Sequence, residues 1–191
     1  ATMLCVIMTD AIISPDAAAA GIKHAVTDSF NCISVDGHES TSDSVILLAN
    51  GASGVGPTTD AERAAFQKAL DEVAMKLATD IIRDAEGAHH FVELNVIGCR
   101  NRDEAFRIAK AIADSPLVKT AICGADPNWG RIVSAAGYAG VPLKEEDMTL
   151  VVNDFLLYRD GAPVDFDAKQ VSSSLRDNRN VTVNLTLKHG T

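Results

Sequence analysis

The amino-acid sequence predicts an α/β (α+β) fold, in which helices pack on a layered mixed sheet. Short apolar segments rich in strand formers are interspersed with longer segments whose apolar residues recur at helical spacing. The 191 residues contain no internal repeat and no low-complexity linker, and 47% of them are hydrophobic. We therefore expect one domain, residues 1–191, with a sizeable core and an ordinary globular composition.

The strand candidates differ in their patterns. Thr2–Thr9 (TMLCVIMT) is short and apolar, which is typical of a buried strand. Phe91–Cys99 alternates apolar and polar residues, as a half-buried strand does. Val45–Ala49 is apolar and fits either a strand or a helix. Further strands are predicted at Ile33–Val35, Lys119–Cys123, Met148–Val152, Phe155–Tyr158 and Val181–Leu187.

Helix starts are marked by capping residues. The SPD sequence at 14–16 places a serine cap, a proline and an acid in order, and predicts a helix to about Asp28. Thr59 and Glu62 form a capping box before the clearest amphipathic segment, which should end near Asp84. Other helices are predicted at Asn101–Ser115, Trp129–Tyr138 and Asp167–Leu175. The flanking strands would make 91–123 a strand–helix–strand unit.

Charge and hydropathy exclude several classes of protein. The formal net charge of −9 argues against binding to a nucleic-acid backbone, because that binding needs clustered Lys and Arg. No apolar run is long enough to span a bilayer, and no secretory leader pattern is present. We expect neither nucleic acid nor membrane as a partner.

Cysteines and histidines give no sign of a metal site. Neighbouring side chains on a strand point to opposite faces, so His89 and His90 form a poor chelate and we expect no metal. The four cysteines include no C-x-x-C pair and stand in apolar contexts. We predict buried free thiols in a reducing compartment. They are Cys5, Cys32, Cys99 and Cys123.

Two further segments have simple interpretations. GASGVG at 51–56 is not followed by Lys-Ser/Thr and lacks dinucleotide-fingerprint spacing, so we interpret it as a flexible turn. The chain opens directly on a buried-type strand and closes on HGT at 189–191, which resembles a hairpin turn with no second strand behind it. Both ends lead us to expect a piece of a larger protein.

Three motifs become specific when taken together. They are ATMLCVIMTDA at 1–11, DAEGAHHFVEL at 84–94 and GADPNWGRI at 124–132, with SVDGHESTSDSVILLANGA at 34–52 between them. In this order the chain resembles, over nearly its whole length, the beta chain of the ornithine acetyltransferases, the bifunctional acetyltransferases of arginine biosynthesis. The resemblance implies the N-terminal-nucleophile-like fold of that family. Composition and periodicity alone indicate only a soluble α/β domain.

The resemblance implies a nucleophile and a partner chain. Family precursors cut themselves at an Ala–Thr bond, here Ala1–Thr2, and the freed Thr2 attacks the substrate. A threonine hydroxyl is weak by itself, and the new α-amine can act as its base. The N-terminal alpha chain of the same precursor would stay bound, in a heterotetramer of two alpha and two beta chains, and supply the oxyanion site and a lysine. The expected reaction moves acetyl from N2-acetylornithine to glutamate through an acetyl-Thr intermediate.

The other candidate residues each have a functional and a structural interpretation. Glu86 occupies the family's substrate-facing Glu-Gly position, where it would bind an ammonium or relay a proton; the alternative is a solvated acid at a helix end. In the loop at 126–131, Asn128 is expected to cap a helix and Trp129 to anchor it, while Arg131 supports the fold or holds a carboxylate. The cluster Ser40–Asp43 is expected to make turn and cap hydrogen bonds or to line the site.

Cofactors, location and rival functions complete the expectations. The resemblance implies no metal or organic cofactor, with acetyl-CoA as an optional co-substrate, and a cytoplasmic enzyme, or one of the mitochondrial matrix in a eukaryote. One alternative is an amidohydrolase or aminopeptidase that uses the same N-terminal threonine with water as acceptor. Another is a non-catalytic subunit, should the Ala1–Thr2 bond stay uncut.

Overall fold

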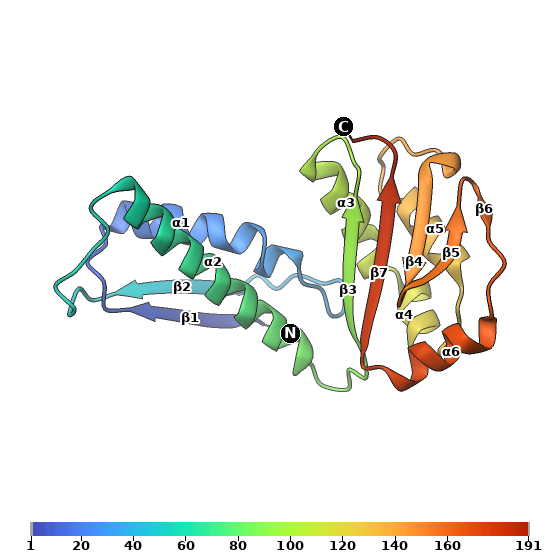
Figure 1. Cartoon of the computed structure of the whole chain (residues 1–191). Helices are drawn as coiled ribbons and strands as arrows, with labels where there is room; N and C mark the ends of the chain where they lie inside the picture. The colour runs from blue at the N-terminus through green and yellow to red at the C-terminus, as the bar shows by residue number, and fades with distance from the viewer. Residues whose placement is uncertain (1, 191) are drawn as a thin grey trace. The chain divides into compact units, whose positions relative to one another are not determined.

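The computed structural model describes residues 2–190 and divides the chain into two compact units, 1–85 and 86–191 (Figure 1). Each unit has its own sheet and its own hydrophobic core. The mixed α/β composition predicted from the sequence is present in both. The single domain expected over residues 1–191 stays a prediction. The structure shows that these residues form two compact units.

The first unit is a parallel two-stranded sheet packed against helices. Strand β1 (Leu4–Thr9) pairs with β2 (Ser44–Ala49). Parallel pairing with β1 therefore decides the ambiguous segment at 45–49 in favour of a strand. The core of the unit joins the sheet to the helices through the buried side chains Cys5, Ile7, Ala25, Phe30, Leu70, Ala74 and Ala78. The helical elements are α1 (Pro15–Thr27), η1 (Phe30–Cys32) and α2 (Asp60–Arg83).

Both helix starts predicted in this unit are confirmed. The hydroxyl of Ser14 accepts the N–H of Ala17 at the start of α1. At the start of α2, Thr59 accepts the N–H of Glu62, and the Glu62 carboxylate accepts the N–H of Thr59 in return. Local sequence therefore sets where these helices begin.

Strand β1 is buried on one face only. Cys5 and Ile7 face the core, whereas Leu4, Val6 and Met8 are 72%, 50% and 77% exposed. The prediction of a buried strand therefore holds only for the face that carries Cys5 and Ile7.

The second unit is a five-stranded mixed sheet with helices on one face (Figure 1). The strand order is β3-β7-β4-β5-β6, in which β3 and β7 are parallel and the other pairs antiparallel. Its strands are β3 (Phe91–Ile97), β4 (Met148–Val152), β5 (Phe155–Arg159), β6 (Ala162–Pro163) and β7 (Asn180–Leu187). Its helices are α3 (Arg102–Asp114), α4 (Pro116–Cys123), α5 (Trp129–Gly137), η2 (Glu145–Asp147) and α6 (Ala168–Asp177).

The core of this unit lies between the sheet and the helices. Every second residue of β7, from Val181 to Leu187, is buried, while the residues between them are half-buried. Ile108 and Ile112 of α3 and Val171 of α6 are at most 2% exposed and belong to the same cluster. This alternation is the period of a strand with one face against helices.

The strand predicted at Lys119–Cys123 is wrong, because this segment is helix α4. Ser115 and Pro116 end α3, but they also start the next helix: Ser115 accepts the N–H of Val118, and the proline occupies the first turn. Proline fits that position because it has no N–H to leave unpaired. The predicted strand–helix–strand unit is therefore absent, and the parallel partner of β3 is β7.

The strand predicted at Ile33–Val35 is also wrong. The residues before it form the short helix η1, and 33–35 join no sheet of the described chain. Ile33 instead packs its side chain against the core of the first unit. An apolar residue that anchors a largely exposed loop thus gave the appearance of a short strand.

The four cysteines are free, as predicted, but only Cys5 is buried; Cys99 is half-buried, and Cys32 and Cys123 are exposed at the ends of short helices. His90 is half-buried and its Nε2 lies 2.9 Å from the carbonyl oxygen of Leu175. Residues 2–190 contain no cluster of side chains suited to hold a metal ion. No helix among them has the length and hydropathy to cross a membrane.

The described end of the chain bonds back to the sheet. The N–H groups of His189 and Gly190 both donate to the carbonyl of Gly98, at 3.0 and 2.7 Å. Residues 189 and 190 are thus tied to the loop after β3, and Thr191 of the predicted turn lies outside the described residues.

Candidate active site

Thr2 stands two residues before the start of β1, with an exposed side chain. Its Oγ1 lies 3.0 Å from Oγ of Ser40. Because β1 and β2 are parallel, the residues that precede them lie at the same end of the sheet, and the N–H of Ser44 donates to the carbonyl of Met3. The topology therefore brings the predicted nucleophile to the polar cluster Ser40–Asp43.

The Asp43 carboxylate accepts backbone N–H groups on both sides of the contact between Thr2 and Ser40. One carboxylate oxygen accepts the N–H of Met3 at 2.8 Å, and the other accepts the N–H of Ser40 at 3.1 Å. These backbone donors, that of Met3 first, hold the pKa of Asp43 below its ordinary value. The carboxylate is therefore charged at neutral pH, and both hydrogen bonds are charge-assisted.

Ser40 shares its hydroxyl between two neighbours. Oγ accepts the N–H of Ser42 at 3.2 Å and also contacts the hydroxyl of Thr2. A serine hydroxyl has two acceptor positions and one donor, so both contacts are satisfied whichever hydroxyl donates. The turn hydrogen bonds predicted for Ser40–Asp43 are confirmed, and the cluster also touches Thr2.

Asp36 lies in the same loop, and its hydrogen bond is to a residue only two positions away. Its Oδ1 accepts the N–H of His38 at 2.9 Å, and this bond lowers the pKa of Asp36. Asp36 and Asp43 are therefore both exposed acids that accept backbone N–H groups, but only Asp43 is linked to Thr2.

Glu86 is exposed in the turn between α2 and β3. Its carboxylate makes no hydrogen bond or ion pair with the rest of residues 2–190. Asp84, its neighbour, forms the C-cap of α2. Since Thr2 and Glu86 belong to different units, the substrate-facing role of Glu86 stays a prediction.

The DPNWGR loop is a structural element of the second unit. Asn128 caps α5 by accepting the N–H of Arg131 at 3.3 Å. The ring of Trp129 stacks on that of Tyr158, with centroids 5.1 Å apart and planes at 27°. The predicted cap and anchor are both confirmed.

Arg131 uses its guanidinium within the fold. Nη1 donates to the carbonyl of Leu117 and to Oγ1 of Thr120, each at 3.1 Å, and Nη2 lies 4.0 Å from the Asp126 carboxylate. These bonds join α5 to α4. The structure thus favours the supporting role over a substrate contact for Arg131.

The GASGVG segment is a hydrogen-bonded turn. Ser53 Oγ donates to the carbonyl of Asp10 at 2.8 Å, and the N–H of Ile12 donates to the carbonyl of Val55 at 2.8 Å. A side chain at Gly56 would place its Cβ 2.2 Å from the carbonyl oxygen of Ile12, so only glycine fits. The segment follows β2 and therefore lies at the opposite end of the sheet from Thr2.

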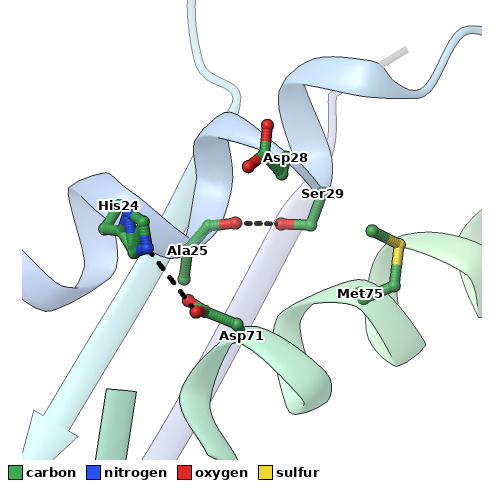
Figure 2. Close-up of a pocket in the computed structure, with 6 residues that line it drawn as sticks. All are labelled: His24, Ala25, Asp28, Ser29, Asp71 and Met75. Atoms are coloured by element: carbon green, nitrogen blue, oxygen red, sulfur yellow. Dashed lines mark hydrogen bonds and ion pairs between the residues drawn. The ribbon is translucent and has the colours of Figure 1, made fainter. Parts of the chain in front are cut away.

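A small cavity lies between α1 and α2 (Figure 2). The His24 ring stands 3.6 Å from the Asp71 carboxylate beside it, and Ser29 Oγ donates to the carbonyl of Ala25 at 2.6 Å. Its volume is about 80 Å³, whereas sites for small molecules usually have about 300–1,000 Å³. The cavity contains neither Thr2 nor Glu86, and we interpret it as a packing feature.

Comparison with known proteins gives consistent matches. The profile described as the ArgJ family matches residues 1–191. The arginine biosynthesis bifunctional protein ArgJ of Rhodopirellula baltica is 47% identical over 196 residues, which cover 100% of this chain and 47% of that protein. The chloroplastic ArgJ of Populus trichocarpa is 44% identical over 179 residues, covering 92% of this chain and 37% of that protein.

A solved structure confirms the fold. The crystal structure of the arginine biosynthesis bifunctional protein ArgJ from Bacillus halodurans superposes with a TM-score of 0.93 at 35% identity, covering 99% of this chain and 90% of that chain. The chain spans less than half the length of the two curated relatives above. By its sequence and its fold, the chain belongs to the ArgJ family.

Proposed function

We propose that this chain carries the nucleophile of an acetyltransferase of arginine biosynthesis, which moves acetyl from N2-acetylornithine to glutamate. Its relatives are named as bifunctional proteins of arginine biosynthesis. The observation that carries the proposal is the placement of Thr2, whose hydroxyl is held 3.0 Å from Ser40 at the end of a parallel sheet.

The first step activates the nucleophile. The Thr2 hydroxyl attacks the carbonyl carbon of Ala1, the peptide C–N bond breaks, and water hydrolyses the resulting ester. This releases the Ala1 carboxylate and the α-amine of Thr2. An α-amine has a pKa of about 7.7–8.0, so a useful fraction is neutral and able to accept the hydroxyl proton.

Two acetyl transfers follow. Oγ1 of Thr2 attacks the acetyl carbonyl carbon of N2-acetylornithine, its proton passes to the α-amine, and the amide C–N bond breaks as the ornithine nitrogen takes up that proton. The neutral amine of glutamate then attacks the acetyl-Thr ester. N-acetylglutamate leaves, and the proton lost by the attacking nitrogen restores the Thr2 hydroxyl. Every bond change is accounted for without a metal or an organic cofactor, and acetyl-CoA would enter as an alternative acetyl donor.

An exposed apolar face supports a partner chain. The outward side chains of β1 and β2 form a continuous stripe of Leu4, Val6, Met8, Ile46 and Leu48, which are 46–77% exposed. Parallel strands are normally covered on both faces. This chain spans only 47% of its relative from R. baltica, and we propose that the preceding part of the same precursor, the alpha chain, covers this face in a heterotetramer of two alpha and two beta chains.

Glu86 would bind the substrate or relay a proton to or from it. Its carboxylate is exposed and makes no ion pair among residues 2–190, so it is available to bind a substrate ammonium or to relay a proton. Arg131, by contrast, is bonded to α4 and is left out of the scheme.

Intact mass and product analysis of the full-length precursor test this function. We expect two chains, the second of which begins at Thr2, and N-acetylglutamate as the product from N2-acetylornithine and glutamate. Free acetate in place of N-acetylglutamate would support the hydrolase alternative. A precursor that folds but stays uncut would identify a non-catalytic subunit.

A further inference from the structure

Asp43 joins the backbone beside Thr2 to the side chain that Thr2 touches. One of its oxygens accepts the N–H of Met3, the residue that follows the nucleophile. The other accepts the N–H of Ser40, whose hydroxyl lies 3.0 Å from Oγ1 of Thr2. These contacts form a closed ring that contains the backbone of Thr2 and its hydroxyl.

We propose, building on the function proposed above, that Asp43 is a positioning residue, which acts through Met3 and Ser40 to hold the Thr2 hydroxyl in line with the acetyl carbonyl carbon. Each contact fixes a different coordinate. The Met3 bond sets the backbone on which Thr2 stands, and the Ser40 bond sets the neighbour that fixes its side-chain rotamer. A nucleophile gains rate from such fixed geometry, because the reacting atoms must come within about 3–3.5 Å in one orientation.

The fold itself does not depend on this carboxylate. Asp43 is exposed, and the β1–β2 ladder aligns the strands through its own backbone bonds from Leu4 onward. The N–H of Ser44 also donates to the carbonyl of Met3 at 2.9 Å. Removal of the Asp43 side chain should therefore loosen Thr2 and the turn around Ser40 while the first unit stays folded.

The chain provides a matched control in Asp36. It is an exposed acid of the same loop, and its carboxylate also accepts a backbone N–H, that of His38. Within the described chain its hydrogen bond does not involve Thr2, Met3 or Ser40. D36N and D43N therefore remove the same charge from the same loop, and only D43N weakens the ring around the nucleophile.

The test measures acetylation of Thr2 in the full-length protein after self-cleavage. Wild type, D43N, D43A, S40A and D36N are mixed with N2-acetylornithine in single turnovers over a range of concentrations. For D43A we expect the maximal acetylation rate to fall about 10- to 100-fold, with a half-saturating concentration within about twofold of wild type, as expected when an interaction of the transition state is lost. D43N should fall less, because its amide oxygen still accepts the Met3 N–H. D36N should match wild type, and all melting temperatures should agree.

Several results would overturn the positioning role. One is that D43N, D43A and S40A all have maximal acetylation rates within about twofold of that of D36N. Another is that these variants change only the half-saturating concentration of N2-acetylornithine and leave the maximal rate unchanged. A D43A protein that fails to fold leaves the decision to D43N and S40A. A variant that folds with the wild-type melting temperature but cuts itself more slowly supports the proposal, because cleavage uses the same hydroxyl. Absence of acetyl on wild-type Thr2 would instead refute the proposed function itself.

Discussion

The apolar face of β1 and β2 gives a sharp prediction for the substitution V6K. Val6 is 50% exposed at the centre of this face. Full burial of a valine side chain is worth about 1.5–3 kcal/mol, so covering the exposed half contributes about 1 kcal/mol to chain association. A lysine ammonium buried without a partner costs several kcal/mol more, reduced where its stem lets the charge reach water. We expect the free energy of chain association to become less favourable by about 3 kcal/mol, which corresponds to a dissociation constant roughly 100-fold higher.

The control for V6K is V73K. Val73 belongs to the same unit and is 44% exposed, but it lies on helix α2. With an affinity tag on the alpha chain of the cleaved protein, the fraction of beta chain retained is measured over serial dilution. V6K should be released at about 100-fold higher protein concentration than wild type, and V73K should behave as wild type. Equal retention of V6K and V73K would refute the assignment of this face to the alpha chain.

Three further predictions concern stability and substrate. Backbone donors at the start of α2 lower the pKa of Glu62 from 4.5 to about 2, so its stabilising contribution is complete above pH 4.5 and is lost as the pH falls toward 2; urea unfolding at pH 6 and pH 3 should show a smaller pH-dependent loss in E62Q than in wild type. E86Q should lower the rate of acetyl transfer at unchanged melting temperature while D84N keeps the wild-type rate, and equal rates would remove Glu86 from the site. W129A loses the stack on Tyr158 and should lower the free energy of unfolding by about 3 kcal/mol, with the acetylation rate of the folded fraction unchanged; a lower rate would give the Trp129 loop a direct role.

Local signals in the sequence predicted local structure well. The capping residues Ser14 and Thr59 marked the starts of α1 and α2, because a cap and its N–H partner lie within three or four residues. The same logic failed at 119–123. There a Ser-Pro pair that ends one helix also begins the next, and an eight-residue apolar helix has the composition of a buried strand.

Contacts between distant residues left no trace in the sequence pattern. Thr2 and Ser40 are 38 positions apart, and only the parallel pairing of β1 with β2 brings them together. The polar composition of Ser40–Asp43 predicted turn hydrogen bonds, but the link from Asp43 to the backbone beside Thr2 needed the structure. The role of Thr2 came from the resemblance of whole motifs, since a threonine before a strand has no chemical signature of its own.

The most direct test of the account is the chemical state of Thr2 during turnover. The full-length, self-cleaved protein is quenched with acid after brief exposure to acetyl-labelled N2-acetylornithine without glutamate, and the peptide that begins at Thr2 is sequenced by mass spectrometry. We predict one labelled acetyl group on the Thr2 oxygen, preserved as an ester when digestion and sequencing are kept at acid pH, and absent in Thr2→Ala. Label on another peptide, or no label on the peptide that begins at Thr2, would contradict the assignment of Thr2 as the nucleophile.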